Sequence, residues 1–463
     1  MMLSFVDTNR RTGRREFLRA GSLALGGLGL PLAFQRSLQA ASMPSLLTDK
    51  TVVFVFMHGG PSQIETFDPK MGAPIGISSA TGEVSTKVPG VTFGGTFPRL
   101  ASLADQMTIV RSFRTGRGNH DVKPIVSAET SNANLGALYA RIAGQNRSDS
   151  GMPTNVSLFP RSVDDSTMPA FKKLGDVQAT GALGAGYAPF NPSGGGNLQA
   201  DMKLNIPMTR LDHRRVLLSE LDRMQRRMEQ DGSWEGLNSI KEQAFSTVLG
   251  GVASAFDLSE EDPATVRRYD TAPLVRTEDI NKKWNNHERY ADNAKSLGKL
   301  MLLARRLCER GCGFVTVTTN FVWDMHADAN NAGVEEGMRY MGLPFDHAIS
   351  TFLEDLQERG LSEKVLLVCC GEMGRTPKLN SLGGRGHWGA LSPLMLAGAG
   401  MPKGQVFGQS TRDAAKPLSE PVEISNLVST ILNTLMDGPQ VRLETGAPKE
   451  VTDALFAAPI PLG

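Results

Sequence analysis

The chain of 463 residues is long enough for one large α/β domain with insertions, or for two or three smaller domains. Its hydrophobic content of 40% and charged content of 21% are typical of a globular protein with a sizeable core. The formal net charge of +1 excludes a strongly basic, nucleic-acid-binding class of protein, so no nucleic-acid partner is expected.

The N-terminal residues 1–41 resemble a bacterial twin-arginine export signal. Arg14 and Arg15 are followed by Phe17 and Leu18, and then by a mild apolar stretch that is too short for a standard membrane span. We therefore expect export by the twin-arginine translocase to the periplasm or the extracellular space, with no stable membrane span in the mature form. An uncleaved leader that tethers the protein, or an arginine-rich first turn of an ordinary helix, is the alternative.

Short apolar runs along the rest of the chain predict strands that are buried on both faces, as in a parallel sheet covered by helices. These runs are residues 51–57, 107–111, 153–159, 313–318, 365–370 and 393–397. Helical periodicity appears at residues 286–310, 346–358 and 424–435, and a helix is expected to begin within 122–139. The sequence thus predicts an α/β fold over residues 42–463, with a mainly parallel sheet, helices on both faces and a helical insertion at about residues 200–310.

The four cysteines are expected to lie in the core and to form no disulfide framework. Cys369 and Cys370 are neighbours in a predicted strand, where adjacent side chains point to opposite faces. Cys308 and Cys312 lie at the end of a predicted helix and just before a strand. None of the four has the spacing of a zinc finger.

Histidines and acids gather at the ends of the predicted strands. In open α/β sheets, ligands bind beyond the carboxyl ends of the strands, so residues that are distant in sequence can meet there. Imidazole nitrogens and carboxylate oxygens are ligands for divalent metals. The sequence therefore predicts a metal site, whose candidate ligands are His58, His120, Asp121, Asp324, His326, Glu372 and His387. The alternative is a set of structural histidines in polar loops without chemistry.

Several short motifs resemble the bacterial exported family catalogued as domain of unknown function 1501 (DUF 1501). They lie, in order, at residues 58–63, 66–69, 118–121, 187–190, 323–326, 371–377 and 384–388. That family is placed in the alkaline-phosphatase and sulfatase-like superfamily. The resemblance implies an alkaline-phosphatase-like fold whose strand-end loops hold one or two divalent metals: zinc, manganese, calcium or magnesium.

The resemblance also implies a metal-dependent hydrolase of phosphate or sulfate esters, with in-line attack on the ester. Asp324, His326 and His387 correspond to one ligand group, while Glu372 and His58 stand where the superfamily supplies acidic ligands. Arg375 or Arg385 is expected to clamp the anion, and His120 to lie in the catalytic neighbourhood. The expected substrate is a small anionic ester or a sulfated or phosphorylated polymer.

Two departures from the superfamily pattern leave an alternative open. His58 replaces a carboxylate, which reduces the negative charge available to a second metal. No serine, threonine or cysteine stands in a nucleophile motif, although Ser62 and Ser127 are candidates. The alternative is therefore a non-catalytic envelope or extracellular protein that retains the fold for binding, for example to anionic polysaccharide.

Overall fold

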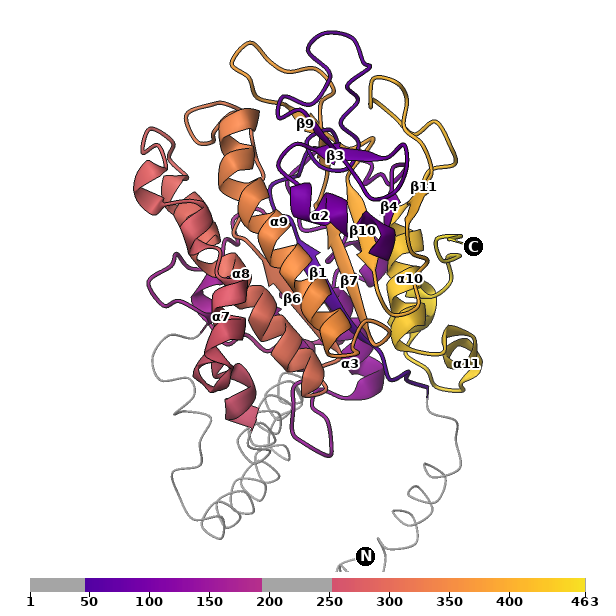
Figure 1. Ribbon diagram of the computed structural model, residues 1–463. Helices are drawn as coiled ribbons and strands as arrows, with labels where there is room; N and C mark the ends of the chain where they lie inside the picture. The colour runs from indigo at the N-terminus through magenta and orange to yellow at the C-terminus, as the bar shows by residue number, and fades with distance from the viewer. Residues whose placement is uncertain (1–45, 194–251, 463) are drawn as a thin grey trace, which may run out of the picture. The chain divides into compact units, whose positions relative to one another are not determined.

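A seven-stranded sheet lies at the centre of the protein in a computed structural model, which describes residues 46–193 and 252–462 (Figure 1). The strand order is β11-β4-β10-β7-β1-β6-β5. Only β10 is antiparallel to its neighbours, so the sheet is mainly parallel, as predicted. The strands are β1 (Thr51–Phe56), β4 (Met107–Val110), β5 (Asn155–Leu158), β6 (Phe314–Thr318), β7 (Val365–Cys370), β10 (Leu394–Ala397) and β11 (Gln405–Phe407).

The three central strands end at one level, and this alignment positions the site. Phe56, the last residue of β1, pairs with Thr318 of β6 on one side and with Cys370 of β7 on the other. All three strands are almost fully buried, and β1 and β7 consist almost entirely of apolar residues, which is the pattern of strands covered on both faces. The loops that follow them therefore leave the sheet side by side.

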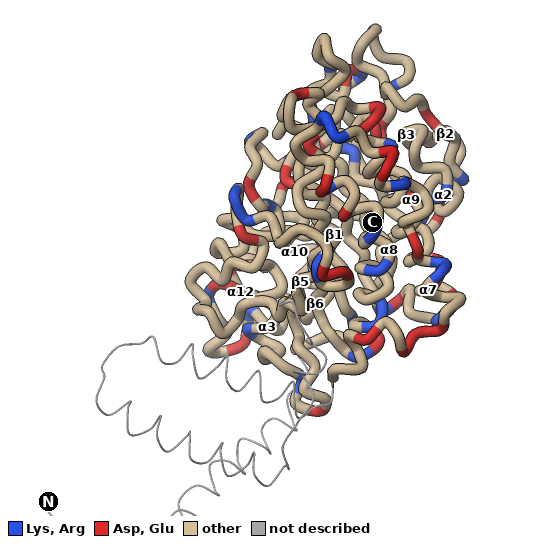
Figure 2. The backbone as a smooth tube through the Cα atoms, turned by 90° about the vertical axis from the view of Figure 1, so that its left-hand side faces the viewer, with Lys and Arg blue, Asp and Glu red and all other residues tan. Residues whose placement is uncertain are grey.

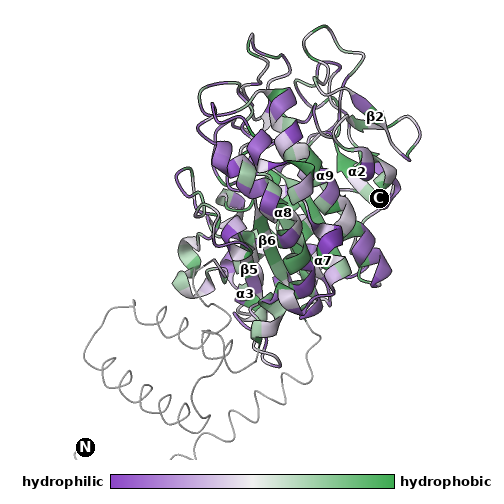
Figure 3. Ribbon diagram, turned by 60° about the vertical axis from the view of Figure 1, so that its left-hand side comes forward, coloured by the Kyte–Doolittle hydropathy of each residue, from purple (hydrophilic) through white to green (hydrophobic). Residues whose placement is uncertain are grey.

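Helices cover both faces of the sheet. Val53 and Val55 of β1 belong to the core shared with α8 and α9, whereas Phe54 and Phe56 point to the opposite face, where α10 contacts β1. The hydropathy colouring in Figure 3 shows the strands as the most apolar elements. The helices are α2 (Pro98–Ser102), α3 (Leu135–Ala143), α7 (Pro263–Tyr269), α8 (His287–Glu309), α9 (Val334–Glu358), α10 (Ile424–Leu435), α11 (Gly438–Leu443) and α12 (Lys449–Ala454).

Helix α9 begins at Val334, twelve residues before the predicted start at Asp346. The first turns of α9 could not be predicted from the sequence, because they contain Pro344 and two glycines, which have low helix propensity. The glycines are required by packing. A Cβ on Gly337 would lie 2.8 Å from the side chain of Met325, and one on Gly342 would lie 2.7 Å from that of Thr96. Tertiary contacts therefore outweigh the weak helix propensity of this segment.

The helix predicted to begin within 122–139 starts near the end of that range, at Leu135. Ser131 and Asn132 adopt left-handed backbone conformations, and the Asn134 side chain caps α3 by accepting from the N–H of Gly136. In the predicted insertion, residues 194–251 lie outside the described residues. Its later part contains α7 and α8, and α8 packs directly on β1 and β6.

All four cysteines are buried and none forms a disulfide. Burial raises the pKa of the Cys308 thiol to about 12 and the pKa values of the other three thiols well above their usual range. Figure 2 shows basic and acidic residues interspersed over the side that it presents. Within residues 46–193 and 252–462, no helix has both the length and the apolar character needed to cross a membrane.

Candidate metal centre

Four side chains from distant parts of the chain converge beyond the carboxyl ends of the central strands. They are His120, Asp324, His326 and His387, and each offers one ligand atom within 4.8 Å of the others. Asp324 Oδ1 lies 3.2 Å from His120 Nε2 and 2.9 Å from His326 Nε2. His387 Nε2 is 3.5 Å from the same oxygen and 2.7 Å from His326 Nε2.

The separations and the donor chemistry of this group suit a single divalent ion. In a tetrahedral zinc site with bonds of about 2.0–2.1 Å, neighbouring ligand atoms lie roughly 3.3 Å apart. His120 Nε2 is buried and forms no hydrogen bond of acceptable geometry, which leaves its lone pair available. The side chains of His326 and His387 are 23% and 31% exposed, against 8% for Asp324, so the group opens to solvent on the side of these two histidines.

Glycine allows the loop after β1 to lie directly against the segment that carries Asp324. Gly59 has φ +116°, and a Cβ there would lie 2.7 Å from the backbone nitrogens of Trp323 and Asp324. The Trp323 N–H donates to the carbonyl of His58 over 3.2 Å. Gly384 plays a similar part, because its Cβ would lie 2.0 Å from the His326 carbonyl oxygen. These glycines permit the close approach of backbones on which the geometry depends.

Asp324 is also the partner of a buried arginine. Arg375 Nη2 lies 2.7 Å from Asp324 Oδ1, and Asn331 donates to Oδ2 over 3.0 Å. Burial by itself would raise the pKa of Asp324. The charge of Arg375 and the contacts with the neighbouring histidines outweigh that effect and hold the pKa of Asp324 well below its usual range. Asp324 is therefore a carboxylate when the site is assembled.

Neither arginine that was predicted to clamp an anion has donors to spare. The Arg375 side chain is 1% exposed and donates to the carbonyls of Gly59 and Gly60 as well as to Asp324. Arg385 is 0% exposed and forms a two-pronged pair with Glu65, with distances of 3.0 and 2.9 Å. Its remaining donors bond to the carbonyls of Ile77, Ser78, Thr376 and Pro377. Both guanidiniums hold the loops together and are saturated by protein acceptors.

Glu372 lies behind His120 and outside the four-residue group. Its carboxylate is fully buried, accepts from the Gly59 N–H over 2.9 Å and lies 2.9 Å from His120 Nδ1. When Nδ1 donates its proton to Glu372, Nε2 faces Asp324 as an acceptor. Burial lowers the pKa of His120, but the two carboxylates, Asp324 and Glu372, outweigh this effect and raise it overall. Glu372 thus orients a candidate ligand, although its sequence position suggested direct ligation.

His58 and Asp121 also stand apart from the group. His58 is 2% exposed and its ring contacts those of Phe56, Phe171 and Phe321. Burial lowers the pKa of His58 to about 4, so the ring is neutral at physiological pH. Asp121 is 38% exposed and pairs with Lys123 over 3.2 Å. The aromatic surroundings of His58 and the surface pairing of Asp121 give both residues local partners outside the group.

Neither candidate nucleophile, Ser62 or Ser127, is among the four residues of the group. Ser62 Oγ makes a short hydrogen bond to Glu65, the buried partner of Arg385. Ser127 lies in a turn in which its N–H donates to Thr130 Oγ1 over 2.9 Å. Glu65 and Asn331 are buried residues of this region that sequence reasoning missed.

The sequence is matched by the model of a known family. The family described as "Protein of unknown function (DUF1501)" matches residues 49–454. The chain belongs to the DUF1501 family. Every residue of the four-residue group lies within the matched range. No curated protein matches the chain.

Solved structures with distant similarity to this DUF1501 chain are ester hydrolases by name. The PsFucS1 sulfatase from Pseudoalteromonas sp. is 11% identical, with 86% of this chain and 69% of that chain covered and a TM-score of 0.36. The phosphonate monoester hydrolase SpPMH from Silicibacter pomeroyi is 11% identical, with 83% and 73% covered and a TM-score of 0.30. The TAB5 alkaline phosphatase is 10% identical, with 84% and 98% covered and a TM-score of 0.30.

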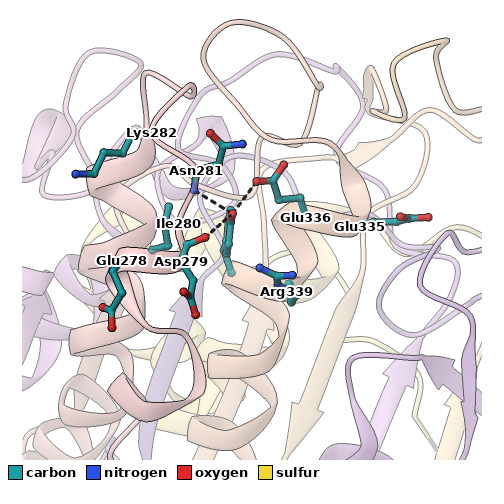
Figure 4. A pocket seen from close by; sticks show the side chains of 9 residues that line it. Glu278, Asp279, Ile280, Asn281, Lys282, Glu335, Glu336 and Arg339 are labelled. Atoms are coloured by element: carbon teal, nitrogen blue, oxygen red, sulfur yellow. Dashed lines mark hydrogen bonds between the residues drawn. The ribbon is translucent and has the colours of Figure 1, made fainter.

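A separate pocket of the DUF1501 chain lies beside the start of α9 and shares no residue with the candidate metal centre (Figure 4). It has a volume of about 760 Å³. Its polar groups are bonded to one another: the Tyr340 hydroxyl donates to Glu336 over 2.6 Å and accepts from the Asn281 N–H over 3.2 Å. The pocket is lined by Glu278, Asp279, Ile280, Asn281, Lys282, Glu335, Glu336, Arg339 and Tyr340.

Proposed function

We propose that the protein is an exported hydrolase of phosphate or sulfate esters that uses one divalent metal ion. The observation that carries the proposal is the convergence of three imidazole nitrogens and one carboxylate oxygen within 4.8 Å at the carboxyl edge of a mainly parallel sheet. The motifs of the DUF1501 family and their resemblance to alkaline-phosphatase-like enzymes support the choice of ester hydrolysis.

The donor set favours zinc among the candidate metals. Three nitrogens and one oxygen are unlike the all-oxygen shells that calcium and magnesium prefer. When bound, such an ion polarises an ester oxygen and makes a bound water more acidic. The residues around the ion orient its ligands and balance their charge. Glu372 holds the His120 ring in one orientation, and Arg375 balances the charge of Asp324.

The charge distribution favours one ion over two. Arg375 already places a fixed positive charge against Asp324, and the neutral His58 stands where the superfamily has an acid. Within the described residues, His120, Asp324, His326 and His387 are the one group of potential ligands that is close enough to hold a metal. A second ion would meet the repulsion of Arg375 without a further cluster of carboxylates to hold it.

Metal content and turnover test the proposal directly. The mature protein, recovered from the periplasmic or extracellular fraction, is expected to contain one zinc per chain and to hydrolyse aryl phosphates or aryl sulfates. A chelator should abolish that activity, and added zinc should restore it. Protein that retains no stoichiometric metal and hydrolyses neither ester with zinc, manganese, calcium or magnesium would instead support the non-catalytic binding alternative. Recovery from the cytosol alone would contradict export.

The supporting role assigned to Glu372 gives a second test. Replacing Glu372 with glutamine removes the charge behind His120 and should weaken zinc binding by about 10- to 100-fold, the usual effect of losing such a partner. Glu363→Gln is the matched control, because Glu363 is a surface residue that pairs with Lys403. Zinc affinity is measured by competition with a chromophoric chelator. An unchanged affinity in Glu372→Gln would show that Glu372 does not orient a metal ligand.

A further inference from the structure

Arg289, in the first turn of α8, is a partly buried cation without an acidic partner in the described part of the chain. Its guanidinium lies over the ring of Phe171, with Cζ 4.8 Å from the ring centroid. Its Nη1 is buried and has no hydrogen-bond partner. Burial lowers the pKa of Arg289, and the more distant charges of Asp292 and Glu288 offset this only in part.

In residues 46–193 and 252–462, each arginine that is buried has an acidic partner, Arg306 included. Arg305, Arg375 and Arg385 each lie within 3.0 Å of a carboxylate. Burying a charge without a partner is costly, so proteins usually pair or expose such groups. An unpaired guanidinium beside a candidate active site is therefore a sign that its partner is a ligand.

A row of aromatic rings connects Arg289 to the candidate metal centre. Phe171 stacks on Phe321 with centroids 4.6 Å apart, and Phe321 meets the edge of His120 at 4.7 Å. His58, which contacts both phenylalanines, lies close enough to feel the charges of Arg289, His120 and Asp324 together. Arg289 therefore lies in the same region as the four-residue group, separated from it by two phenylalanine rings.

The segment that carries Phe171 is anchored at both sides of this row. The Phe171 N–H donates to Asn320 Oδ1 over 3.1 Å, just beyond the end of β6. The Met168 N–H donates to Asp292 Oδ2 over 2.8 Å, one turn after Arg289 in α8. Phe171 is thus held in place, and its ring supports the guanidinium of Arg289 from one side. A guanidinium held in this way keeps its in-plane N–H groups available for an oxyanion.

We propose that Arg289 binds a second oxyanion of the substrate, next to the ester that is bound at the metal centre. The preferred substrate would then carry at least two sulfate or phosphate groups, as a sulfated or phosphorylated polymer does. The inference rests on the proposed function, because it places substrate at the same site. It also explains which residue recognises anions, since the donors of Arg375 and Arg385 are taken by protein acceptors.

Binding of defined polyanions to the mature, zinc-treated protein tests the inference. Short dextran sulfate and inorganic tripolyphosphate are titrated by calorimetry, with neutral dextran as the control for charge. Arg289→Met should weaken binding of the preferred polyanion by about tenfold or more, the usual effect of losing charge-assisted hydrogen bonds. Arg289→Lys, which keeps the charge, should retain part of the affinity. Comparison of the two probes distinguishes sulfate from phosphate.

Arg339→Met is the matched control, because the exposed Arg339 also lies over an aromatic ring, that of Tyr340. Its affinity for the polyanion should stay within about twofold of the original. Thermal unfolding of each variant checks that the fold is retained. The inference is overturned if neither polyanion binds, or if Arg289→Met binds as tightly as the unmodified protein.

Different measurements distinguish failure of this inference from failure of the proposed function. Zinc content and aryl-ester turnover are measured on the same samples. Protein without zinc or turnover that still binds the polyanion through Arg289 would contradict the hydrolase and keep the anion-binding residue. Active, zinc-containing protein whose polyanion binding does not depend on Arg289 would do the reverse.

Discussion

Replacing Asp324 with alanine is expected to remove zinc from the protein and to destabilise the fold by about 3–5 kcal/mol. The loss of metal follows because Asp324 Oδ1 is the atom on which all three histidines converge. The loss of stability follows because Arg375, which is 1% exposed, would keep its charge without a carboxylate beside it. Elemental analysis measures the first effect, and urea unfolding at matched metal content measures the second.

His387→Ala separates these two effects. The imidazole of His387 is 31% exposed, and its removal leaves no buried charge behind. This variant should therefore lose zinc as Asp324→Ala does, yet unfold close to the metal-free original protein. If Asp324→Ala keeps its zinc, the assigned ligands are wrong. If the two variants are equally stable, the pairing of Asp324 with Arg375 contributes little to the fold.

Replacing Arg385 with leucine should have a comparable effect on stability without removing a proposed metal ligand. Glu65 would remain fully buried without its basic partner, and the carbonyls around the guanidinium would lose their donors. Removing one member of a buried ion pair typically costs about 3–5 kcal/mol. The shift in the urea midpoint, with an unchanged slope, measures this cost.

A double variant identifies the source of that loss. Arg385→Leu combined with Glu65→Gln removes both charges and should recover part of the stability lost in the single variant. Arg412→Leu is the surface control, since Arg412 donates only to the Gly72 carbonyl at an exposed position. A single Arg385→Leu variant that loses less than about 1 kcal/mol would show that the pair is not needed to hold the loops.

The meeting of distant histidines at one edge could be predicted from the sequence. The strands at residues 51–57, 313–318 and 365–370 are confirmed, and they are neighbours whose last residues align. Because parallel strands share a carboxyl edge, the residues after them had to emerge together. The reversal of β10 could not be predicted, since its apolar run has the same composition in either direction.

The roles within the site were less predictable, because each depends on a partner that is remote in sequence. Glu372 follows a core strand, as a ligand would, yet it binds Gly59 and His120 through contacts that no local pattern encodes. From the sequence alone, Arg375 and Arg385 were expected to be free to bind an anion. In the structure Arg375 pairs with Asp324, and Arg385 pairs with Glu65. Arg289 gave no signal at all, since it lies among other charges in a helix.

The reactivity of the four buried cysteines can be used to follow unfolding of the protein. Only a thiolate reacts readily with alkylating reagents, and folding both hides these four sulfurs and opposes their ionisation. The rate at which an alkylating reagent modifies these cysteines would therefore report how often the core opens. This rate can be measured for each variant without an added label. Because all four cysteines are free, the fold of the protein uses no disulfide bond.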